Sequence, residues 1–380
     1  MNKYQKIRKV LSMCRHSKDY TRWTSYYPNE PHKSEKEILL DQIRIFWKYE
    51  KTEPFYFLYG FDRKLANKDF MSQYITPYDV FESKINLNNK RKPYSLAQKG
   101  YNVNQCLHGR TLTANKYYFG TILEKLGYPV PRMLCFISRG EIKYLINKDR
   151  CEYVDGDVRT VLADFLKCDM DAFCKPAGGQ LGQGIFSLKV SEGKIFVAGK
   201  ETRSDDTIDL LLSNDYLVQD RLVQHDALKR LNDSCFNTIR LQTVQTPEGD
   251  IIPFGPVLRI GKKGCEVDNW AKGGICVGID MNTGKLMDKG FLKPAYGTVV
   301  TKHPDSGIVF EGYEIPFFKE AVKVACSAHG QLFHSHSIGW DIAITPNGPA
   351  FIEANGLWEI SLIQAAHGGL KKEIEQYFYN

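Results

Sequence analysis

Residues 339–355, with the sequence GWDIAITPNGPAFIEAN, constrain the fold more than any other stretch of the chain. Two apolar-rich segments flank a Pro-Asn-Gly turn, which predicts a β-hairpin. Pairing about a three-residue loop at 346–348 places Asp341 directly opposite Glu353, with Gly348 in the left-handed conformation that such a loop needs. Asn355 shares the face of Glu353, because side chains alternate along a strand. We therefore predict two carboxylates and one amide on a single face.

These three side chains offer oxygen ligands of the kind that Mg²⁺ prefers when it is bound together with substrate phosphates. Without a cation, Asp341 and Glu353 would repel each other across the strand pair. A solvated acidic face on a surface hairpin is the alternative. The apolar flanks of both strands favour a half-buried pair, so we predict Asp341, Glu353 and Asn355 as metal ligands.

A glycine-rich segment follows Lys175, with four glycines in seven residues. Glycine lets backbone N–H groups approach an anion closely. A Walker loop would end in Gly-Lys-Ser/Thr, and a Rossmann loop would open a helix. Residues 185–190 instead alternate as in a strand. The pattern favours a hairpin that folds over phosphates, with a mobile hairpin that binds nothing as the alternative. Its glycines are Gly178, Gly179, Gly182 and Gly184.

Helical and strand patterns are mixed along the chain without a regular βαβ alternation, which indicates the α+β class. Residues 113–127 carry a helical apolar stripe, with Thr113 as N-cap and Gly127 as terminator. Further helices are expected at 158–168 and about 316–333. Residues 1–50 also read as helical.

The composition is that of a soluble globular protein, with 43% apolar and 25% charged residues. No apolar run reaches the roughly 18 residues of a membrane span. Residues 1–23 are basic and amphipathic and lack the core of a signal peptide, so we expect a cytoplasmic protein. They are interpreted as a plain surface helix or as a helix that docks on an anionic membrane surface.

The ten cysteines include no CxxC pair and no zinc spacing, which indicates reduced thiols. The net charge of +7 comes without a Lys/Arg block interleaved with aromatic residues. A phosphorylated or carboxylated small substrate explains this charge as well as nucleic acid does.

Together these motifs resemble the ATP-grasp superfamily over about residues 113–368. Asn115 and Lys116 open a helix that is followed by GYPVP at 127–131, then come the Lys175 hairpin and the carboxylate hairpin. The intervening segments are similar to the sugar-transfer-associated ATP-grasp group, which is linked to polysaccharide synthesis. They are VQDRLVQH at 218–225, NTIR at 237–240, RIG at 259–261, VDN at 267–269 and GGI at 273–275.

The resemblance implies an ATP-grasp fold, in which two α+β lobes clasp ATP, preceded by a helical region. It divides the chain into a mainly helical region at 1–105, an N-terminal and phosphate-hairpin lobe at 106–215, and a C-terminal lobe with the metal site at 216–380. Two positions depart from related ligases. Asn115 stands where an aspartate is usual. Gly339 stands where D-alanine–D-alanine ligases have an arginine, so the oxyanion arginine must come from elsewhere.

The resemblance also implies roles for individual residues. Lys116 and Lys175 would hold the ATP phosphates, covered by the 179–184 hairpin. The metal ligands would bind one or two Mg²⁺ ions. The remaining assignments are a hinge beside adenine at Gln219, Asp220, Arg221 and Leu222, a ribose contact from His225 or Asp226, and positive charge at the γ-phosphate and oxyanion from Arg240, Arg259 and Lys272.

The expected activity is an ATP- and Mg²⁺-dependent carboxylate–amine or carboxylate–thiol ligase that acts through an acylphosphate. Its partners would be a small-molecule or glycan-precursor carboxylate and an amine acceptor, with no nucleic acid and at most a peripheral membrane contact. The resemblance suggests amide formation on a uronic acid or amino-acid unit of a surface glycan. An ATP-grasp kinase and a non-catalytic nucleotide-binding module are the two alternatives, and the intact lysines and metal ligands speak against the second.

Overall fold

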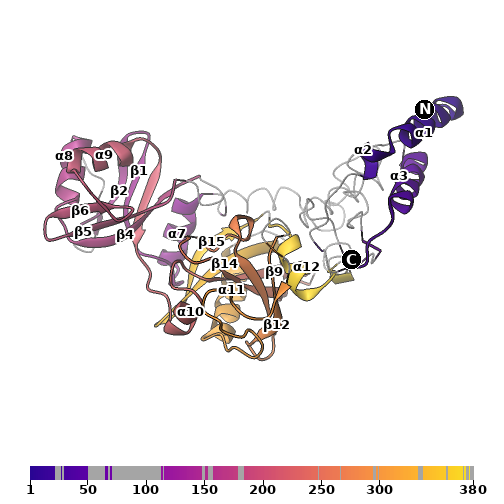
Figure 1. The fold of residues 1–380 in the computed structure, drawn as a ribbon. Coiled ribbons are helices and arrows are strands. Elements are labelled where there is room, and N and C mark those ends of the chain that lie inside the picture. The colour runs from indigo at the N-terminus through magenta and orange to yellow at the C-terminus, as the bar shows by residue number, and fades with distance from the viewer. Residues whose placement is uncertain are drawn as a thin grey trace.

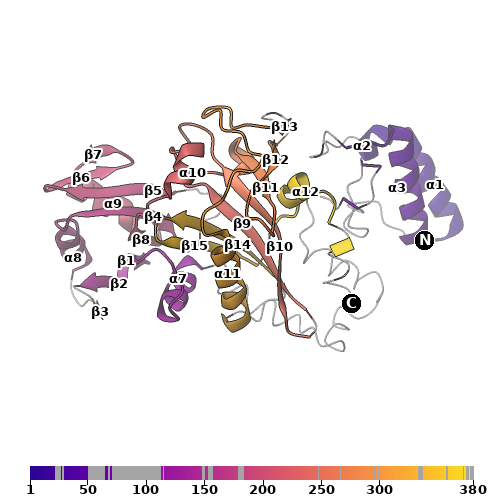
Figure 2. The same cartoon turned by 90° about the horizontal axis from the view of Figure 1, so that it is seen from below.

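The computed structural model has two antiparallel sheets with helices on their faces, and confirms the α+β class (Figure 1). The helices α1 (Lys3–Arg15), α2 (Ser17–Thr21) and α3 (Glu35–Tyr49) lie beyond the second sheet, away from the first (Figures 1 and 2). The structure describes residues 1–21, 27, 30–49, 65–66, 69–70, 113, 115–147, 150–152, 157–178, 184–246, 248–265, 267–293, 297, 299–332, 337–356, 358–370, 372–373 and 376.

The first sheet has the strand order β3-β2-β1-β8-β4-β5-β6-β7 among the described residues. Its bounds are β1 (Met133–Ser138), β2 (Glu141–Asn147), β3 (Arg150–Glu152), β4 (Met170–Pro176), β5 (Phe186–Ser191), β6 (Lys194–Val197), β7 (Lys200–Thr202) and β8 (Tyr216–Asp220). Helices α8 (Val158–Phe165) and α9 (Ser204–Leu212) bury Leu162 and Leu211 in one core with the apolar side chains of these strands. This core fixes the strands that carry the phosphate-binding candidates.

Helix α7 (Lys116–Lys125) connects the two halves of the molecule. Tyr117 stacks on Phe136 of the first sheet, with ring centroids 4.2 Å apart, whereas Phe119 and Leu123 belong to the core of the second sheet. Asn115 caps the helix by accepting hydrogen bonds from two backbone N–H groups. The predicted cap at Thr113 is therefore wrong by two residues, because the helix begins at Lys116. The predicted end is confirmed, since Gly127 has φ +78°.

The glycine segment lies in a hairpin, as predicted, because β4 and β5 pair antiparallel and place Cys174 opposite Phe186. Gly178 and Gly184 stand on either side of the connection, whereas Gly179 and Gly182 lie outside the described residues. At Gly184, with φ +71°, a side chain would be strained and would meet the Pro176 ring at 3.1 Å.

The second sheet has the order β13-β12-β11-β10-β9-β14-β15 in the described part of the chain. Its bounds are β9 (Thr238–Gln245), β10 (Ile251–Ile260), β11 (Ile275–Ile279), β12 (Leu286–Phe291), β13 (Val299–Val300), β14 (Ser337–Thr345) and β15 (Gly348–Asn355). Helix α11 (Phe318–Leu332) packs its alanines on one face, and α12 (Ser361–His367) buries Leu362 against Val257 and Cys276 on the other. The short helices α10 (Asp226–Leu231) and η2 (Trp270–Lys272) lie in connections.

The register of the decisive hairpin is confirmed where it matters, since Asp341 pairs with Glu353. The predicted three-residue loop is wrong, because Thr345 pairs with Gly348 and leaves a two-residue turn. A register shift between Asp341 and Ile342 compensates for the shorter turn, because two residues of β15 oppose one residue of β14 there. Gly348 has φ +118°, in the region that favours glycine.

The predicted lobe boundary at 215/216 falls directly before β8, and β8 pairs with β1 and β4 of the first sheet. The chain passes to the second sheet only after Asp220. The division into lobes between residues 215 and 216 stays a prediction. Tyr27, which precedes α3, contacts the helix that packs on the second sheet. Its hydroxyl accepts a hydrogen bond from Gln364 of α12 at 2.8 Å.

Candidate functional site

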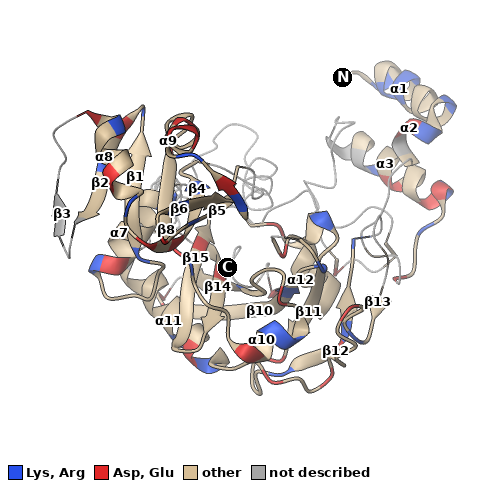
Figure 3. Cartoon of the chain, turned by 60° about the vertical axis from the view of Figure 1, so that its left-hand side comes forward, with Lys and Arg blue, Asp and Glu red and all other residues tan. Residues whose placement is uncertain are grey.

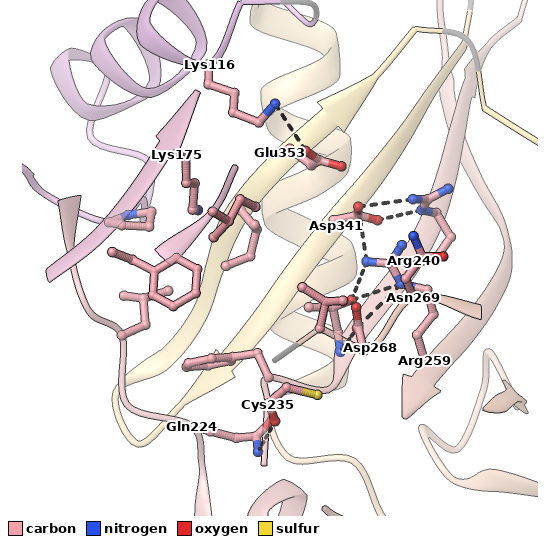
Figure 4. Close-up of a pocket in the computed structure, with 18 of the residues that line it drawn as sticks. Lys116, Lys175, Gln224, Cys235, Arg240, Arg259, Asp268, Asn269, Asp341 and Glu353 are labelled. Atoms are coloured by element: carbon pink, nitrogen blue, oxygen red, sulfur yellow. Dashed lines mark hydrogen bonds and ion pairs between the residues drawn. The ribbon is translucent and has the colours of Figure 1, made fainter. Parts of the chain in front are cut away.

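A cleft of about 1240 Å³ separates the two sheets. One wall comes from β4 and β8 of the first sheet and from the segment that follows β8. The other wall comes from β9, β10, β14 and β15 of the second sheet. Figure 4 shows how the charged side chains of both walls point into the same space. The cleft therefore lies where two halves of the chain, each with its own core, face each other.

Asp341 is the centre of a charged ladder that crosses three strands. It pairs with Glu353 of β15 on one side and with Arg240 of β9 on the other. Arg240 donates to both carboxylate oxygens of Asp341, at 2.5 and 3.0 Å. Arg259 of β10 adds an ion pair at 3.1 Å. Asp341 is only 2% exposed, so these two guanidinium groups stabilise its negative charge in place of water.

The two carboxylates differ in their ease of ionisation. Burial opposes the charge of Asp341, but Arg240 and Arg259 outweigh burial and lower its pKa below the usual range. Burial and the neighbouring Asp341 charge raise the pKa of Glu353, and Lys116 opposes that shift. Asp341 is therefore ionised at ordinary pH values. Ionisation of Glu353 would be favoured by a cation bound nearby.

The donor set of Asp341, Glu353 and Asn355 fits Mg²⁺. Arg240 and Arg259 contact both oxygens of Asp341 through two hydrogen bonds and one ion pair, so this carboxylate is already partly occupied. The Asn355 amide nitrogen approaches Gly339 O and Glu353 Oε1, each at 3.5 Å, which leaves its oxygen for a cation. Within the described residues, no three His, Cys, Asp or Glu side chains are placed so that they alone could hold a metal ion. A cation here would need further ligands, such as phosphate oxygens.

Two lysines face this acidic pair from the first-sheet side (Figure 4). Lys116 Nζ lies 3.9 Å from Glu353 Oε2. Lys175, at the end of β4, is 8% exposed and makes no ion pair with the described residues. Burial and the Lys116 charge lower the pKa of Lys175 to about 8, and Glu353 opposes that shift. Two adjacent cations with little water are a suitable binding site for a polyphosphate.

The glycine that departs from related ligases has a packing cause. A Cβ atom at Gly339 would lie 2.7 Å from Cβ of Trp358, which is fully buried. An arginine cannot occupy this position without displacing that tryptophan. Arg259 brings a guanidinium group to Asp341 from a different strand, β10, and so occupies the region where we expected a replacement.

A buried set of polar residues that the sequence did not single out as site residues holds Arg259. The Thr238 hydroxyl accepts from Arg259 Nη2 at 2.6 Å and donates to Asp268 Oδ2 at 2.5 Å. Asp268 also accepts from the Thr238 backbone N–H, at 2.9 Å. Asp268 belongs to the VDN segment, but its role depends on contacts across 30 residues. Asn269 and Trp270 beside it also line the cleft.

The hinge candidates lie at the end of β8 and directly after it. Gln219, Asp220, Arg221 and Leu222 all line the cleft. The Asp220 and Arg221 N–H groups already donate to Arg132 O and Asp171 O, both at 2.9 Å. The Leu222 N–H group has no hydrogen-bond partner within the described part of the chain. It is therefore the backbone donor that a planar base could use.

Four of the predicted site residues that the structure describes lie outside the cleft lining, namely Gly184, His225, Asp226 and Lys272. His225 caps α10 by accepting from the Ala227 N–H at 3.1 Å, and the Asp226 carboxylate pairs with Lys229 at 3.2 Å in solvent. Lys272 is exposed on η2. The structure does not bring these side chains to the charged ladder, and their assigned roles stay predictions. Gly178 lines the cleft, whereas Gly184 does not.

Comparison with known proteins shows the family to which the chain belongs. The sequence pattern of the sugar-transfer associated ATP-grasp family matches residues 98–377. The chain belongs to this family. Its fold is the ATP-grasp fold, as the sequence motifs predicted. A search of curated proteins finds no match.

Solved structures similar to this ATP-grasp protein include several ligases. One is an ADP complex of N5-carboxyaminoimidazole ribonucleotide synthetase, with 11% identity, a TM-score of 0.36, and coverage of 66% of this chain and 46% of that chain. D-alanine–D-alanine ligase from Helicobacter pylori has 13% identity, a TM-score of 0.36, and coverage of 70% and 60%. L-amino acid ligase from Bacillus licheniformis has 11% identity, a TM-score of 0.37, and coverage of 71% and 49%. The chain spans about half the length of these proteins.

Proposed function

We propose that this protein is an ATP- and Mg²⁺-dependent ligase that activates a carboxylate as an acylphosphate and transfers the acyl group to an amine or thiol. The observation that carries the proposal is the meeting of Lys116 and Lys175 with the Glu353–Asp341–Arg240 ladder in one cleft. The lysines would hold a polyphosphate and the carboxylates its metal, and the arginines contact the Asp341 carboxylate. This order of charges suits transfer of a terminal phosphoryl group.

In the proposed reaction, a substrate carboxylate oxygen attacks the γ-phosphorus of ATP and the bond to the β-phosphate oxygen breaks. The products of this step are an acylphosphate and ADP. The amine then attacks the acyl carbon, loses a proton and expels inorganic phosphate. Lys175 and Lys116 hold the phosphates, and Mg²⁺ held by Asp341, Glu353 and Asn355 would neutralise their charge. Arg259 and Arg240 stabilise the negative charge that develops on the transferred group and on the acyl oxygen.

This route requires no nucleophile from the protein, and the one cysteine among the residues lining the cleft suits that requirement. Burial and the Asp268 charge raise the pKa of Cys235 to about 12, so its thiol is protonated at neutral pH. A thiol in that state is a poor nucleophile.

For the nucleotide, we propose that adenine contacts the Leu222 backbone at the hinge and that the 179–184 hairpin covers the phosphates. His225 or Asp226 is the proposed ribose contact, and Lys272 is a proposed source of added charge near the γ-phosphate. Both last assignments require the surrounding segments to move toward the cleft, because neither side chain lines it now.

For the substrates, we propose a glycan-precursor carboxylate, such as a uronic acid or an amino-acid unit, and an amine acceptor. The family description, sugar-transfer associated, supports a role in polysaccharide synthesis. The names of the similar structures, which include an amino acid ligase, support C–N bond formation. A protein that consumes ATP in this way would act in the cytoplasm.

The test follows ADP and inorganic phosphate together, with MgATP and a panel of sugar acids, amino acids and amines. The ligase proposal expects both products in equal amounts, dependent on one acid, and absent in an Asp341→Asn, Glu353→Gln variant. ADP without free phosphate, together with a phosphorylated product, would replace the proposal by a kinase. Tight ATP binding without turnover across a broad panel would favour a non-catalytic nucleotide-binding module.

A further inference from the structure

Helix α1 has an exposed apolar stripe that the ATP-grasp site does not use. Tyr4, Ile7 and Leu11 are 70%, 43% and 54% exposed. Their spacing of three and four residues places them on one face of the helix. Contiguous apolar side chains at the surface of a monomer mark an interaction site more often than chance exposure. These residues lie far in sequence from every residue of the cleft.

The stripe is not the side on which α1 packs. Met13 is fully buried, and Lys6 Nζ lies 5.9 Å from the centroid of the Trp47 ring and 3.4 Å from the Trp47 carbonyl oxygen. These contacts hold α1 against α3. At about 100° per residue, Met13 and the stripe lie on different sides of the helix. One side of the helix therefore packs within the chain, and the apolar stripe on another side is exposed to solvent.

Positive charge borders the stripe on both sides. Lys3 lies on one side of it around the helix, and Arg8 and Arg15 lie on the other, at about 100° per residue. Residues 1–18 contain six Lys or Arg and no Asp or Glu. Figure 3 shows the blue Lys and Arg bands along α1. An apolar stripe between cations is the pattern of a helix that lies in a membrane interface, where long cationic side chains reach the headgroups.

We propose that α1 docks on an anionic lipid surface, with Tyr4, Ile7 and Leu11 in the interface and the flanking cations on lipid phosphates. Charge decides between this partner and two others. A second copy of the chain would bring six like charges against six. A nucleic acid would use the cations but gain little from an exposed apolar stripe. No helix in the described residues is long and apolar enough to cross a membrane, so α1 would lie on the surface.

The experiment is flotation of the full chain with vesicles of phosphatidylcholine, with and without 30% phosphatidylserine, at low and high salt. The proposal expects binding to the anionic vesicles only and release by salt. Ile7→Ser with Leu11→Ser should weaken binding at least about tenfold. Arg8→Glu with Arg15→Glu should weaken it on the order of 100-fold.

Matched control variants distinguish binding through α1 from nonspecific binding by exposed apolar side chains or by net positive charge. Val309→Ser removes an apolar side chain that is 57% exposed, and Lys194→Glu with Lys200→Glu changes net charge equally on the first sheet. Both should bind like the unmodified chain. Circular dichroism and ATP affinity show that each variant is folded.

Absence of binding to anionic vesicles would overturn the proposal, as would binding that survives both α1 variants. Conversion of a dimer to a monomer by Ile7→Ser with Leu11→Ser, without vesicle binding, would assign the stripe to self-association and also overturn it. The result is independent of the ligase assay, because α1 contributes no residue to the cleft.

Discussion

The two walls of the cleft are built differently. On the second-sheet side, Asp341, Arg240, Arg259, Thr238 and Asp268 are linked by hydrogen bonds and ion pairs that satisfy one another. On the first-sheet side, Lys175 is buried next to another cation, and the glycine hairpin begins just after it. One wall holds its charges in place before a ligand arrives, whereas the other holds charge that a phosphate would satisfy. A preorganised wall suits transition-state stabilisation, and an unsatisfied wall suits binding.

Asp341→Asn is the change that should break the preorganised wall most severely. It leaves the partly buried Arg240 and Arg259 without their shared anion, which costs about 3 kcal/mol in the free energy of unfolding. It also removes a metal ligand, so turnover should fall on the order of 1000-fold or more. Urea unfolding and the phosphate assay measure the two effects. Full stability together with full activity would show that the ladder has neither role.

Lys175→Met tests the other wall, and its effects should separate. Loss of a charged contact to phosphate should weaken ATP binding on the order of 100-fold. The free energy of unfolding should not fall, because a buried lysine with a lowered pKa costs stability when charged. Calorimetry measures the ATP affinity, and urea unfolding measures the free energy of unfolding. A large loss of stability would mean that Lys175 is part of a satisfied network after all.

Gly339→Ala sharpens the comparison by disturbing the packing under the preorganised wall. Its new methyl group would lie 2.7 Å from Trp358 Cβ, so we expect a loss of about 2 kcal/mol. Gly330→Ala in α11 is the control. A Cβ atom at Gly330 would lie at an ordinary contact distance of 3.6 Å from the Ile251 side chain. That control should be neutral or slightly stabilising. Equal melting temperatures for the two variants would contradict the packing explanation for Gly339.

The smallest expected effect is on pH dependence. Lys175, with a pKa of about 8 in the free protein, is charged below that pH and neutral above it. ATP affinity should therefore be highest below pH 8 and fall as pH rises through it, by up to about tenfold near pH 9. Lys175→Arg should flatten the profile, because arginine stays charged. A wild-type affinity that is constant from pH 7 to 9 would place another cation at the phosphates.

Local patterns predicted much of this structure. The alternation in 339–355 was enough to bring Asp341 opposite Glu353, because a strand has a period of two. The loop length was predicted one residue too long, since no local pattern marks the irregularity beside Ile342. Asn115 takes the capping role predicted for Thr113, because the helix begins at Lys116.

Long-range contacts account for what the sequence did not reveal. Arg240 lies 101 residues before Asp341, and only the pairing of β9 with β14 brings them together. Asp268 becomes recognisable as a candidate site residue only through its contacts with Thr238 of β9 and Arg259 of β10. His225 shows the reverse case, in which a residue expected at the ribose caps a short helix. Family resemblance named the arginines but did not reveal the network that holds them.

The most direct test of the central claim is calorimetry of ATP binding with and without Mg²⁺, on the unmodified chain and on Asp341→Asn with Glu353→Gln. If the two walls form one MgATP site, Mg²⁺ strengthens ATP binding to the unmodified chain and loses most of that effect in the variant, while Lys175→Met weakens binding in both conditions. Absence of nucleotide binding, or an identical Mg²⁺ effect in the carboxylate variant, would contradict the account.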